Sequence, residues 1–482
     1  MSANPLAPAW LTLPTDANAL APGLWSMNSA RTAGGHVSIA GVDAAELAAR
    51  FGTPVYVIDE ADALARARGI HDAFSREFSR IGSHVHVYYA GKAFLSIDVA
   101  RWMASAGLNI DLSSGGELAV ALAAGIAPAR LGLHGNNKSL AEIDRAVQVG
   151  VGAIVIDSAQ ETERVADAAV RHGRVQVVRL RINSGVHAST HEYLATARED
   201  QKFGITIADA PALVARIRGN PHLSFLGLHS HIGSQIFEPD GFAEAARRLL
   251  TLHAQLLADG PVPELNIGGG FGIAHTSADE PASIESIAAA LAEVIGEECA
   301  RLHIAVPDIA IEPGRSIIGP STTTLYTVGT TKDVVVTLEG EPHGGVEPAA
   351  LRRYVSVDGG MSDNIRPSLY RADYSVRIVN RSSDAAPVLV RLAGKHCESG
   401  DIVVHADYLP GDVAPGDIVG VPATGAYGWS MASNYNYLAR PPVVAVRDGV
   451  ARLLVRRETE ADLLARDMGL HEPGETDTGA PE

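Results

Sequence analysis

The stretch Arg130–Asp157, RLGLHGNNKSLAEIDRAVQVGVGAIVID, contains the unit from which the fold can be deduced. Arg130–His134 is a short apolar run, Ser139–Val149 has apolar residues at helical spacing, and Ala153–Asp157 is a second short run rich in β-branched residues. Strand, helix and strand in this order are typical of a parallel βα repeat.

The same alternation extends in both directions, from about Val85 to Arg315. A helical segment follows each of the first seven of eight strand-like runs. The runs are Val85–Tyr89, Leu108–Leu112, Arg130–His134, Ala153–Asp157, Val175–Ile182, Ser224–His231, Glu264–Ile267 and Asp308–Glu312. Eight parallel strands predict a closed (β/α)8 TIM barrel.

Beyond Arg315 the helical spacing fades and strand-like runs predict a C-terminal, mainly β domain. These runs are Thr323–Val328, Tyr354–Val357, Ser375–Val379, Val388–Leu392, Ile402–His405, Asp417–Val421 and Val443–Val446. Two earlier runs, His36–Ile39 and Val55–Ile58, are expected to pair with this domain. The expected parts are a flexible tail (1–30), N-terminal strands packing with the β domain (31–60), the barrel (61–316), the β domain (317–465) and a second flexible tail (466–482).

Composition narrows the class of protein. The formal net charge of −17 argues against a nucleic-acid or membrane-surface partner, both of which need a basic face. No apolar run is long enough to span a membrane. The only two cysteines, Cys299 and Cys397, lie far apart and form neither a disulfide framework nor a metal-binding spacing. We therefore expect a cytoplasmic protein.

Three of the predicted strand ends carry residues suited to pyridoxal 5'-phosphate (PLP), and in such barrels reactive groups gather where the strands end. Lys92 follows the first strand and could form a Schiff base, although a surface lysine is an equal reading of its position. Gly268–Gly270 follow the seventh strand and could bind a phosphate, although glycine clusters more often form simple turns. Glu312 ends the eighth strand, where a carboxylate could keep a pyridine nitrogen protonated.

The sixth strand ends in His229-Ser230-His231-Ile232-Gly233-Ser234. Alternate strand residues point to opposite faces, so only one of the two histidines is expected to face the barrel interior, and no metal site is predicted. His231 could lie flat on a cofactor ring, and Ser234 could contact its phosphate.

Three segments of the β domain are too polar and too rich in glycine for a core strand. Cys397 in GKHCESGD is predicted to be a reactive thiol, whereas Cys299 in an Ala-rich helix receives no role. Arg366 could bind a substrate carboxylate and Tyr427 a phosphate, with solvated turns as the alternative for both segments.

Taken together, these motifs resemble the diaminopimelate decarboxylases. The resemblance runs from about Ala40 to Asp467, and HGNNKS together with HEYLATAREDQKFG (191–204) resembles the actinobacterial branch of that family. The motifs are YAGKA at Lys92, SSGGEL (113–118), HGNNKS (134–139), HSHIGSQ (229–235), GGGFG (268–272), EPGR (312–315), DGGMSDNIRPSLY (358–370), GKHCESGD (394–401) and TGAYG (424–428).

The resemblance implies a PLP enzyme with an alanine-racemase-like barrel, working as a homodimer whose sites are completed by the neighbouring chain. It implies that Lys92 holds PLP as an internal aldimine, that His231 stacks on the ring and that Glu312 pairs with the ring nitrogen. The phosphate would be held by Ser234, Gly268, Gly269, Gly270 and Tyr427. The substrate would be contacted by Arg315, Arg366, Tyr370, Tyr427 and the neighbouring chain's Glu398, which comes with Cys397.

The implied reaction converts meso-2,6-diaminopimelate to L-lysine and CO2 through an external aldimine, with Cys397 as the acid that protonates Cα. A decarboxylase for basic amino acids or carboxynorspermidine is the runner-up, but Arg315 and Arg366 favour a substrate with a distal carboxylate. A racemase is disfavoured by Glu312. A catalytically dead PLP-binding regulator is disfavoured because Lys92 and Cys397 are both present.

Three positions depart from the usual wording of the family. Ser189 replaces a common His, Arg371 follows Tyr370 where Gly is frequent, and Gly428 follows Tyr427 where Cys is frequent. An added cation at Arg371 could alter the grip on the distal carboxylate.

Overall fold

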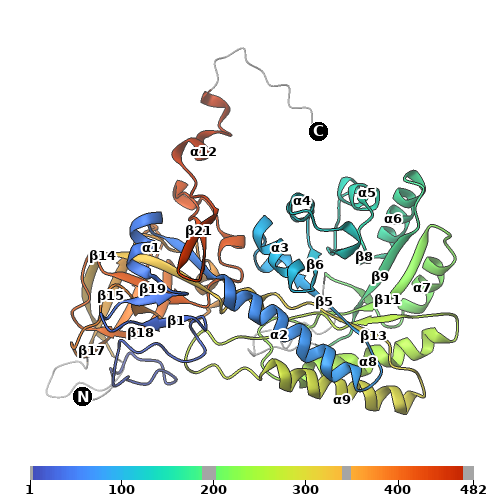
Figure 1. Cartoon of the computed structure of the whole chain (residues 1–482), viewed down its shortest axis with the longest axis horizontal. Coiled ribbons are helices and arrows are strands. Elements are labelled where there is room, and N and C mark those ends of the chain that lie inside the picture. The colour runs from blue at the N-terminus through green and yellow to red at the C-terminus, as the bar shows by residue number, and fades with distance from the viewer. Residues whose placement is uncertain (1–3, 187–201, 339–348, 471–482) are drawn as a thin grey trace.

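The computed structural model describes residues 4–186, 202–338 and 349–470, and its central element is a closed parallel barrel (Figure 1). Each barrel strand pairs in parallel with the next, and the last pairs with the first, so the predicted (β/α)8 barrel is confirmed. The strands are β5 (Val85–Ala90), β6 (Asn109–Leu112), β7 (Leu131–Leu133), β8 (Ala153–Ile156), β9 (Gln176–Asn183), β11 (Leu223–His229), β12 (Glu264–Asn266) and β13 (Asp308–Ile311). The two-residue strand β10 (Ile205–Thr206) adds to β9.

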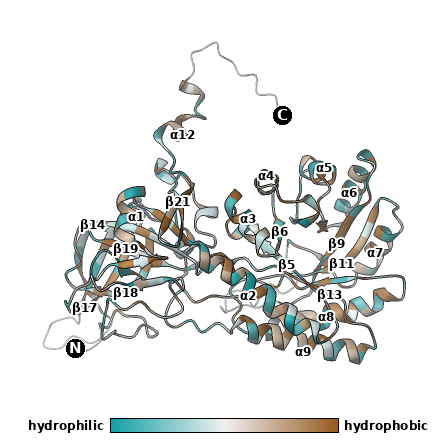
Figure 2. Ribbon diagram, in the orientation of Figure 1, coloured by the Kyte–Doolittle hydropathy of each residue, from teal (hydrophilic) through white to brown (hydrophobic). Residues whose placement is uncertain are grey.

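Helices cover the outside of the barrel. They are α2 (Glu60–Ser79), α3 (Ile97–Ser105), α4 (Gly115–Ala123), α5 (Leu140–Val149), α6 (Ala159–Arg171), α7 (Ala210–Arg218), α8 (Asp240–Leu257) and α9 (Ile284–Leu302). Serine side chains cap the start of several of them, and Ser139 with Glu142 forms a full capping box at α5. Apolar and polar colours alternate along α8 and α9 in Figure 2, as expected for helices that bury one face.

The second domain is a large sheet with the strand order β18-β17-β15-β14-β4-β20-β21, to which β19 and β16 add through β14. Its strands are β4 (Val55–Asp59), β14 (Thr322–Thr337), β15 (Ala349–Val357), β16 (Arg377–Ile378), β17 (Pro387–Ala393), β18 (Ile402–Pro410), β19 (Ile418–Pro422), β20 (Val443–Arg447) and β21 (Val450–Val455). The early strand β4 lies between β14 and β20, which joins the two ends of the chain. β21 was not expected from the sequence.

One of the two early strands differs from expectation. Val37–Ile39 (β2) does not join the large sheet; it pairs with β1 (Ser29–Arg31) and β3 (Val42–Asp43), followed by α1 (Ala44–Phe51). This small sheet still packs against the β domain, because Val37 and Ile39 share a buried cluster with Val57, Leu325 and Val444.

The described part of the expected N-terminal tail is packed rather than free. Leu24 and Trp25 are buried, and Leu6 and Leu11 lie against Tyr408 of β18. Their apolar side chains, hidden among Pro and Ala in the sequence, explain why composition alone misjudged this segment.

At the other end, α12 (Glu460–Leu464) follows β21, and residues 471–482 of the expected C-terminal tail lie outside the described residues. Among the helices that the structure describes, none has the length and apolar character of a membrane span.

Candidate active site

Lys92 lies at the mouth of the barrel, in a single helical turn (Gly91–Ala93) that directly follows β5. Its neighbours Ala93 and Phe94 are buried, but the Lys92 side chain is exposed at the barrel mouth in the single chain. The Ala93 carbonyl accepts hydrogen bonds from the Tyr427 backbone N–H (2.9 Å) and the Ser430 hydroxyl (3.0 Å). The turn that carries Lys92 is thereby tied to the β domain.

Glu312, at the end of β13, is the buried acidic centre of the mouth. Its Oε1 accepts a hydrogen bond from Asn266 Nδ2 at 2.7 Å and lies 3.0 Å from His229 Nε2. Burial by itself would raise the pKa of Glu312, but the imidazoles of His229 and His134 hold that pKa well below its ordinary value. Glu312 is therefore ionised at neutral pH.

Asp111, at the end of β6, is a second buried carboxyl group beside Glu312. Burial and the charge of Glu312 raise the pKa of Asp111 well above its ordinary value. His134 Nε2 lies between the two carboxyl groups, 3.0 Å from Asp111 Oδ1 and 3.6 Å from Glu312 Oε1. The pKa values of the two carboxyl groups are therefore shifted in opposite directions, which favours the charge on Glu312 and the proton on Asp111.

Both His229 and His231 face the mouth, which corrects the expectation that only one would. β11 ends at His229, so the alternation of strand side chains does not extend to His231. Burial lowers the pKa of His229 to about 4 and that of His134 to about 3, so both imidazoles are neutral at pH 7. Burial and then the charge of Lys92 hold the pKa of His231 well below its ordinary value.

His134, His229 and Glu312 place their possible ligand atoms within 4.8 Å of one another, so a three-ligand metal geometry exists at the mouth. It is a different set from the His229 and His231 pair considered in the sequence. Asn266 donates to Glu312 Oε1, the oxygen that also lies nearest to both histidines. The geometry is that of a network of hydrogen-bonding groups around one carboxylate, and the absence of a metal stays a prediction.

The turn after β12 brings Gly268, Gly269 and Gly270 against the neighbouring strand ends. A Cβ atom on Gly269 would lie 1.9 Å from the Glu312 carbonyl oxygen, and one on Gly268 would lie 2.4 Å from that of Ser230. Gly268 and Gly270 also have positive φ values of 73° and 116°. Only glycine fits this turn, which leaves bare backbone at the mouth.

Two arginines from different elements gather beside this turn. Arg315, in α10 (Arg315–Ile318), is buried; its guanidinium carbon lies 4.7 Å from the centre of the Tyr427 ring, and its Nη2 donates to Ser234 Oγ at 3.2 Å. Arg366, in α11 (Arg366–Tyr370), is also buried, and burial followed by the charge of Arg366 lowers the pKa of Arg315 to about 10. Two like charges held together in a buried site favour an anion.

Arg366 is positioned by two residues that sequence reasoning missed. Its Nη1 donates to the Tyr374 hydroxyl and lies 3.0 Å from His275 Nε2. Arg315 Nε and Nη1 and Arg366 Nε have no hydrogen-bond partner among the described residues. The predicted residue Tyr370, by contrast, is 57% exposed.

Cys397 and Glu398 lie on the loop between β17 and β18 and are exposed. The loop is firmly held: His396 Nε2 lies 2.8 Å from Ser362 Oγ, and Asp401 accepts from the backbone N–H groups of Met361 and His396. The structure therefore fixes the loop but presents the thiol to the outside of the chain. Cys299 is buried in α9, as expected.

The residues at the mouth fit PLP. The glycine turn offers backbone to a phosphate, Glu312 offers an ionised carboxylate to a ring nitrogen, and Lys92 offers an amine. His134 Nε2, both His229 ring nitrogens and both Asp111 oxygens are buried without a well-aligned hydrogen bond among the described residues. Buried polar atoms of this kind indicate a site that faces a polar ligand.

The comparison with protein families gives the class. The family described as pyridoxal-dependent decarboxylase, pyridoxal binding domain, matches residues 65–319, which span the whole barrel. The chain is thus a member of the pyridoxal-dependent decarboxylases.

Within that class, the chain belongs to the diaminopimelate decarboxylase family. It is 49% identical over 457 residues to the diaminopimelate decarboxylase of Mycobacterium tuberculosis, covering 93% of this chain and 98% of the relative. It is 44% identical over 455 residues to that of Corynebacterium efficiens, covering 94% and 95%. These actinobacterial relatives confirm the predicted branch.

Solved structures of diaminopimelate decarboxylases support the same family. The diaminopimelate decarboxylase of M. jannaschii superimposes with a TM-score of 0.83 at 29% identity, covering 92% of this chain and 98% of that one. The same protein in complex with L-lysine gives the same values.

The backbone bears differently on the departures from the family wording. Arg371 has a φ of 53° at the end of α11, a left-handed conformation that favours glycine, so nothing in the backbone explains the arginine. At Gly428 a Cβ atom would lie 2.6 Å from the Thr424 carbonyl oxygen, so the turn here is too tight for a larger residue. Ser189 lies outside the described residues.

Proposed function

We propose that this chain decarboxylates meso-2,6-diaminopimelate to L-lysine and CO2, the last step of lysine biosynthesis. The observation that carries this proposal is the buried pair Arg315 and Arg366 beside the barrel mouth, with guanidinium nitrogens that lack partners among the described residues. Diaminopimelate has a second carboxylate at its distal end, whereas ornithine, arginine and lysine do not. A buried cation pair suits that carboxylate and would repel a distal ammonium or guanidinium group that has no carboxylate beside it.

The cofactor is PLP, held by Lys92 through its amine, by Ser234, Gly268–Gly270 and Tyr427 at its phosphate, and by Glu312 at its ring nitrogen. When bound, PLP supplies an electron-poor ring that accepts the electron pair released as CO2 leaves. Glu312 is ionised and held by Asn266, so it keeps a proton on the ring nitrogen. The neutral imidazole of His231 adds no competing positive charge beside the ring.

The chain's other task is to deliver a proton to Cα after CO2 has left. We assign this to Cys397, with Glu398 next to it as a contact for the substrate. Lys92, exposed at the barrel mouth, would hold the cofactor through its amine between turnovers. Arg366, fixed by Tyr374 and His275, holds the distal carboxylate so that only the α-carboxylate is presented to the ring.

Product analysis tests the substrate. PLP-loaded protein is incubated with meso-diaminopimelate, ornithine, arginine and lysine, and both CO2 and the amine product are measured. We expect L-lysine and CO2 from diaminopimelate alone. Turnover of another amino acid instead would refute the argument from Arg315 and Arg366 while leaving the cofactor assignment intact.

We also infer that the enzyme is a homodimer with shared sites. Cys397 and Glu398 are exposed in the chain described, on a loop whose position is fixed by His396 and Asp401. A thiol that must reach Cα cannot be effective while it faces outward, so a second chain is needed to bring it to a barrel mouth. The exposed aromatic side chains of Tyr370 and Tyr437 suit the same contact surface.

Mixing two inactive variants tests this arrangement. Lys92→Ala removes one half of a shared site and Cys397→Ala the other, so a mixed dimer has one site with both halves intact. Random reassembly of equal amounts should restore about a quarter of wild-type activity. A mixture as inactive as its parents, with exchange of subunits verified by differently tagged chains, would show that each site is built from one chain.

The two cysteines, one buried and one exposed, favour a reducing compartment, and we infer that the enzyme works in the cytoplasm.

A further inference from the structure

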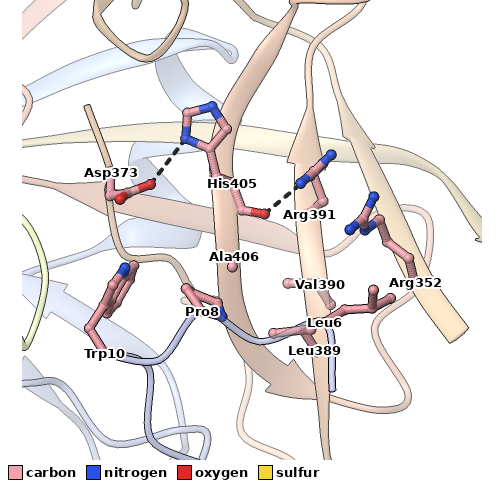
Figure 3. Close-up of a pocket in the computed structure, with 10 residues that line it drawn as sticks. All are labelled: Leu6, Pro8, Trp10, Arg352, Asp373, Leu389, Val390, Arg391, His405 and Ala406. Carbon is pink, nitrogen blue, oxygen red and sulfur yellow. Dashed lines mark hydrogen bonds and ion pairs between the residues drawn. The ribbon is translucent and has the colours of Figure 1, made fainter. Parts of the chain in front are cut away.

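A cavity of about 180 Å³ lies in the β domain (Figure 3). The N-terminal segment forms one wall and strands β15, β17 and β18 form the other. The lining residues are Leu6, Pro8, Trp10, Arg352, Asp373, Leu389, Val390, Arg391, His405 and Ala406. None of them belongs to the active site described above.

Arg391 lines the cavity at a point where the strand pairing is irregular. The pairing of β17 with β18 shifts between Val390 and Leu392, so Arg391 faces an irregularity in the ladder. Arg391 Nε donates to the His405 carbonyl oxygen at 3.1 Å, which fixes the side chain (Figure 3). Bulges of this kind often redirect one side chain out of the regular pattern.

A second arginine joins it. Tyr354 and Arg391 are paired neighbours on β15 and β17, and Arg352 lies two residues before Tyr354 on the same face. The guanidinium carbon of Arg391 lies 5.9 Å from the centre of the Tyr354 ring. Burial would raise the pKa of Tyr354, but the neighbouring Arg352 and Arg391 lower it. Both arginines line the cavity, so two guanidinium groups lie beside the same side chain.

The neighbouring Arg353, by contrast, is fully paired with a carboxylate. It points to the opposite face of the strand, where it donates to both carboxylate oxygens of Asp333 at 2.7 Å. Arg391 donates to a carbonyl oxygen instead, and neither Arg352 nor Arg391 forms an ion pair with a carboxylate among the described residues. The only acidic residue that lines the cavity, Asp373, is 3.0 Å from His405 Nδ1.

The rest of the cavity is apolar. Leu6, Pro8 and Trp10 face Leu389 and Ala406 across it (Figure 3). A cavity of about 150 Å³ can hold a molecule the size of benzene, so this one has room for a ligand of about six to ten non-hydrogen atoms.

We propose that this cavity binds a small carboxylate with an apolar chain. The carboxylate lies between Arg352 and Arg391, where planar guanidinium groups match its two oxygens. The chain lies against Leu6, Trp10 and Leu389, whose surfaces leave water when it binds. This site is separate from the proposed catalytic reaction and does not depend on it.

Hexanoate is a suitable probe because it has both parts and eight non-hydrogen atoms. Binding to the PLP-loaded enzyme is followed by calorimetry and by the fluorescence of Trp10, with Trp10→Phe to identify that signal. We expect saturable binding, and Arg391→Gln or Arg352→Gln should weaken it about tenfold or more, since each removes a charge-assisted hydrogen bond. Arg353→Gln is the matched control and should leave the affinity unchanged.

Two further measurements distinguish this cavity from the active site and from a site that takes any anion. Arg366→Gln changes the active site and should leave hexanoate affinity unchanged; loss of binding there, with retention in Arg391→Gln, would place the ligand in the active site and overturn the proposal. Inorganic phosphate should bind more weakly than hexanoate, and equal binding would remove the role assigned to the apolar wall. No response at about 50 mM hexanoate would also overturn it. Arg391→Lys keeps the charge and should bind hexanoate more tightly than Arg391→Gln. This control shows that the loss of binding in Arg391→Gln is not caused by misfolding.

Discussion

The barrel mouth and the β-domain loops contribute to the proposed site in opposite ways. At the mouth, the polar groups are buried and contact one another: Glu312, Asp111 and His229 all lie within a single network. On the loops, Cys397 and Glu398 are exposed although their backbone is held in place. The barrel mouth is thus nearly complete in a single chain. The β-domain loops have a fixed backbone, but their functional side chains are exposed.

This difference separates two tasks. A buried network with fixed protonation states suits a permanent cofactor, because its charges must stay matched through many cycles. An exposed loop suits a group that acts once per cycle on a substrate and that a second chain can bring into place. Variants of the two regions should therefore differ in whether PLP is lost or only turnover falls.

The largest expected effect is the contrast between Lys92 and Cys397. Lys92→Ala should lower kcat by more than about 10³-fold and abolish the absorbance band of lysine-bound PLP. Cys397→Ala should lower kcat by about 10²–10⁴-fold through slower protonation, yet keep one PLP per chain with an unchanged spectrum. Stopped-flow absorbance and PLP stoichiometry measure both. Full turnover by Cys397→Ala would mean that another group is the acid.

The two carboxyl groups of the mouth give a sharper test, because they lie together but differ in protonation. Glu312→Gln removes an ionised group and should lower kcat by about 10²–10³-fold. Asp111→Asn replaces a protonated carboxyl group with an amide of the same shape and should lower kcat by less than about tenfold. Equal losses in the two variants would contradict the assigned protonation states.

The sequence predicted the barrel because strand and helix spacing repeat locally, and it predicted Lys92, Gly268–Gly270 and Glu312 because strand ends share one face of a barrel. It missed the roles of Asp111 and His134, which occupy equivalent strand ends but are separated by other elements in the chain. Their close contact depends on how the barrel closes, and no local pattern encodes that. Asp111 could have been found by asking why an apolar strand ends in a carboxyl group.

The buried pair Arg315 and Arg366 gives a test of substrate binding that is separate from cofactor binding. Arg366→Gln should lower kcat/KM for diaminopimelate about 10²-fold, because a buried carboxylate would lose a charged partner. The effect should fall mainly on KM, with PLP stoichiometry and spectrum unchanged, since Arg366 contacts Tyr374 and His275 rather than the mouth network. Steady-state kinetics measures it. A loss of PLP would show that the two regions are not separable.

His253, in the helix shell of the barrel, should make the acid stability of that region pH-dependent. Burial lowers its pKa to about 4, below the ordinary 6.5, so between these values the unfolded chain binds a proton that the folded chain does not. Stability is fully present above about pH 6.5 and falls as the pH drops toward 4. His253→Leu should recover about 1–2 kcal/mol of that loss at pH 5 and almost none at pH 7.5, measured by thermal unfolding at both values. An equal shift at both values would assign the effect to packing.

The smallest effect is expected at Arg371, on the β-domain side. A φ of 53° destabilises a residue with a side chain by about 1 kcal/mol, whereas glycine adopts it without strain. Arg371→Gly should therefore raise the melting temperature by about 1–2 °C. The Arg371 side chain is exposed, unlike Arg366, so kcat/KM for diaminopimelate should stay within about twofold of the wild type. Arg371→Gln keeps the strained backbone and removes the charge, which separates the two contributions. If Arg371→Gln alone lowered kcat/KM, the Arg371 cation would contribute to binding the distal carboxylate. The exposed β-domain residues would then contact the substrate in addition to the buried Arg315 and Arg366.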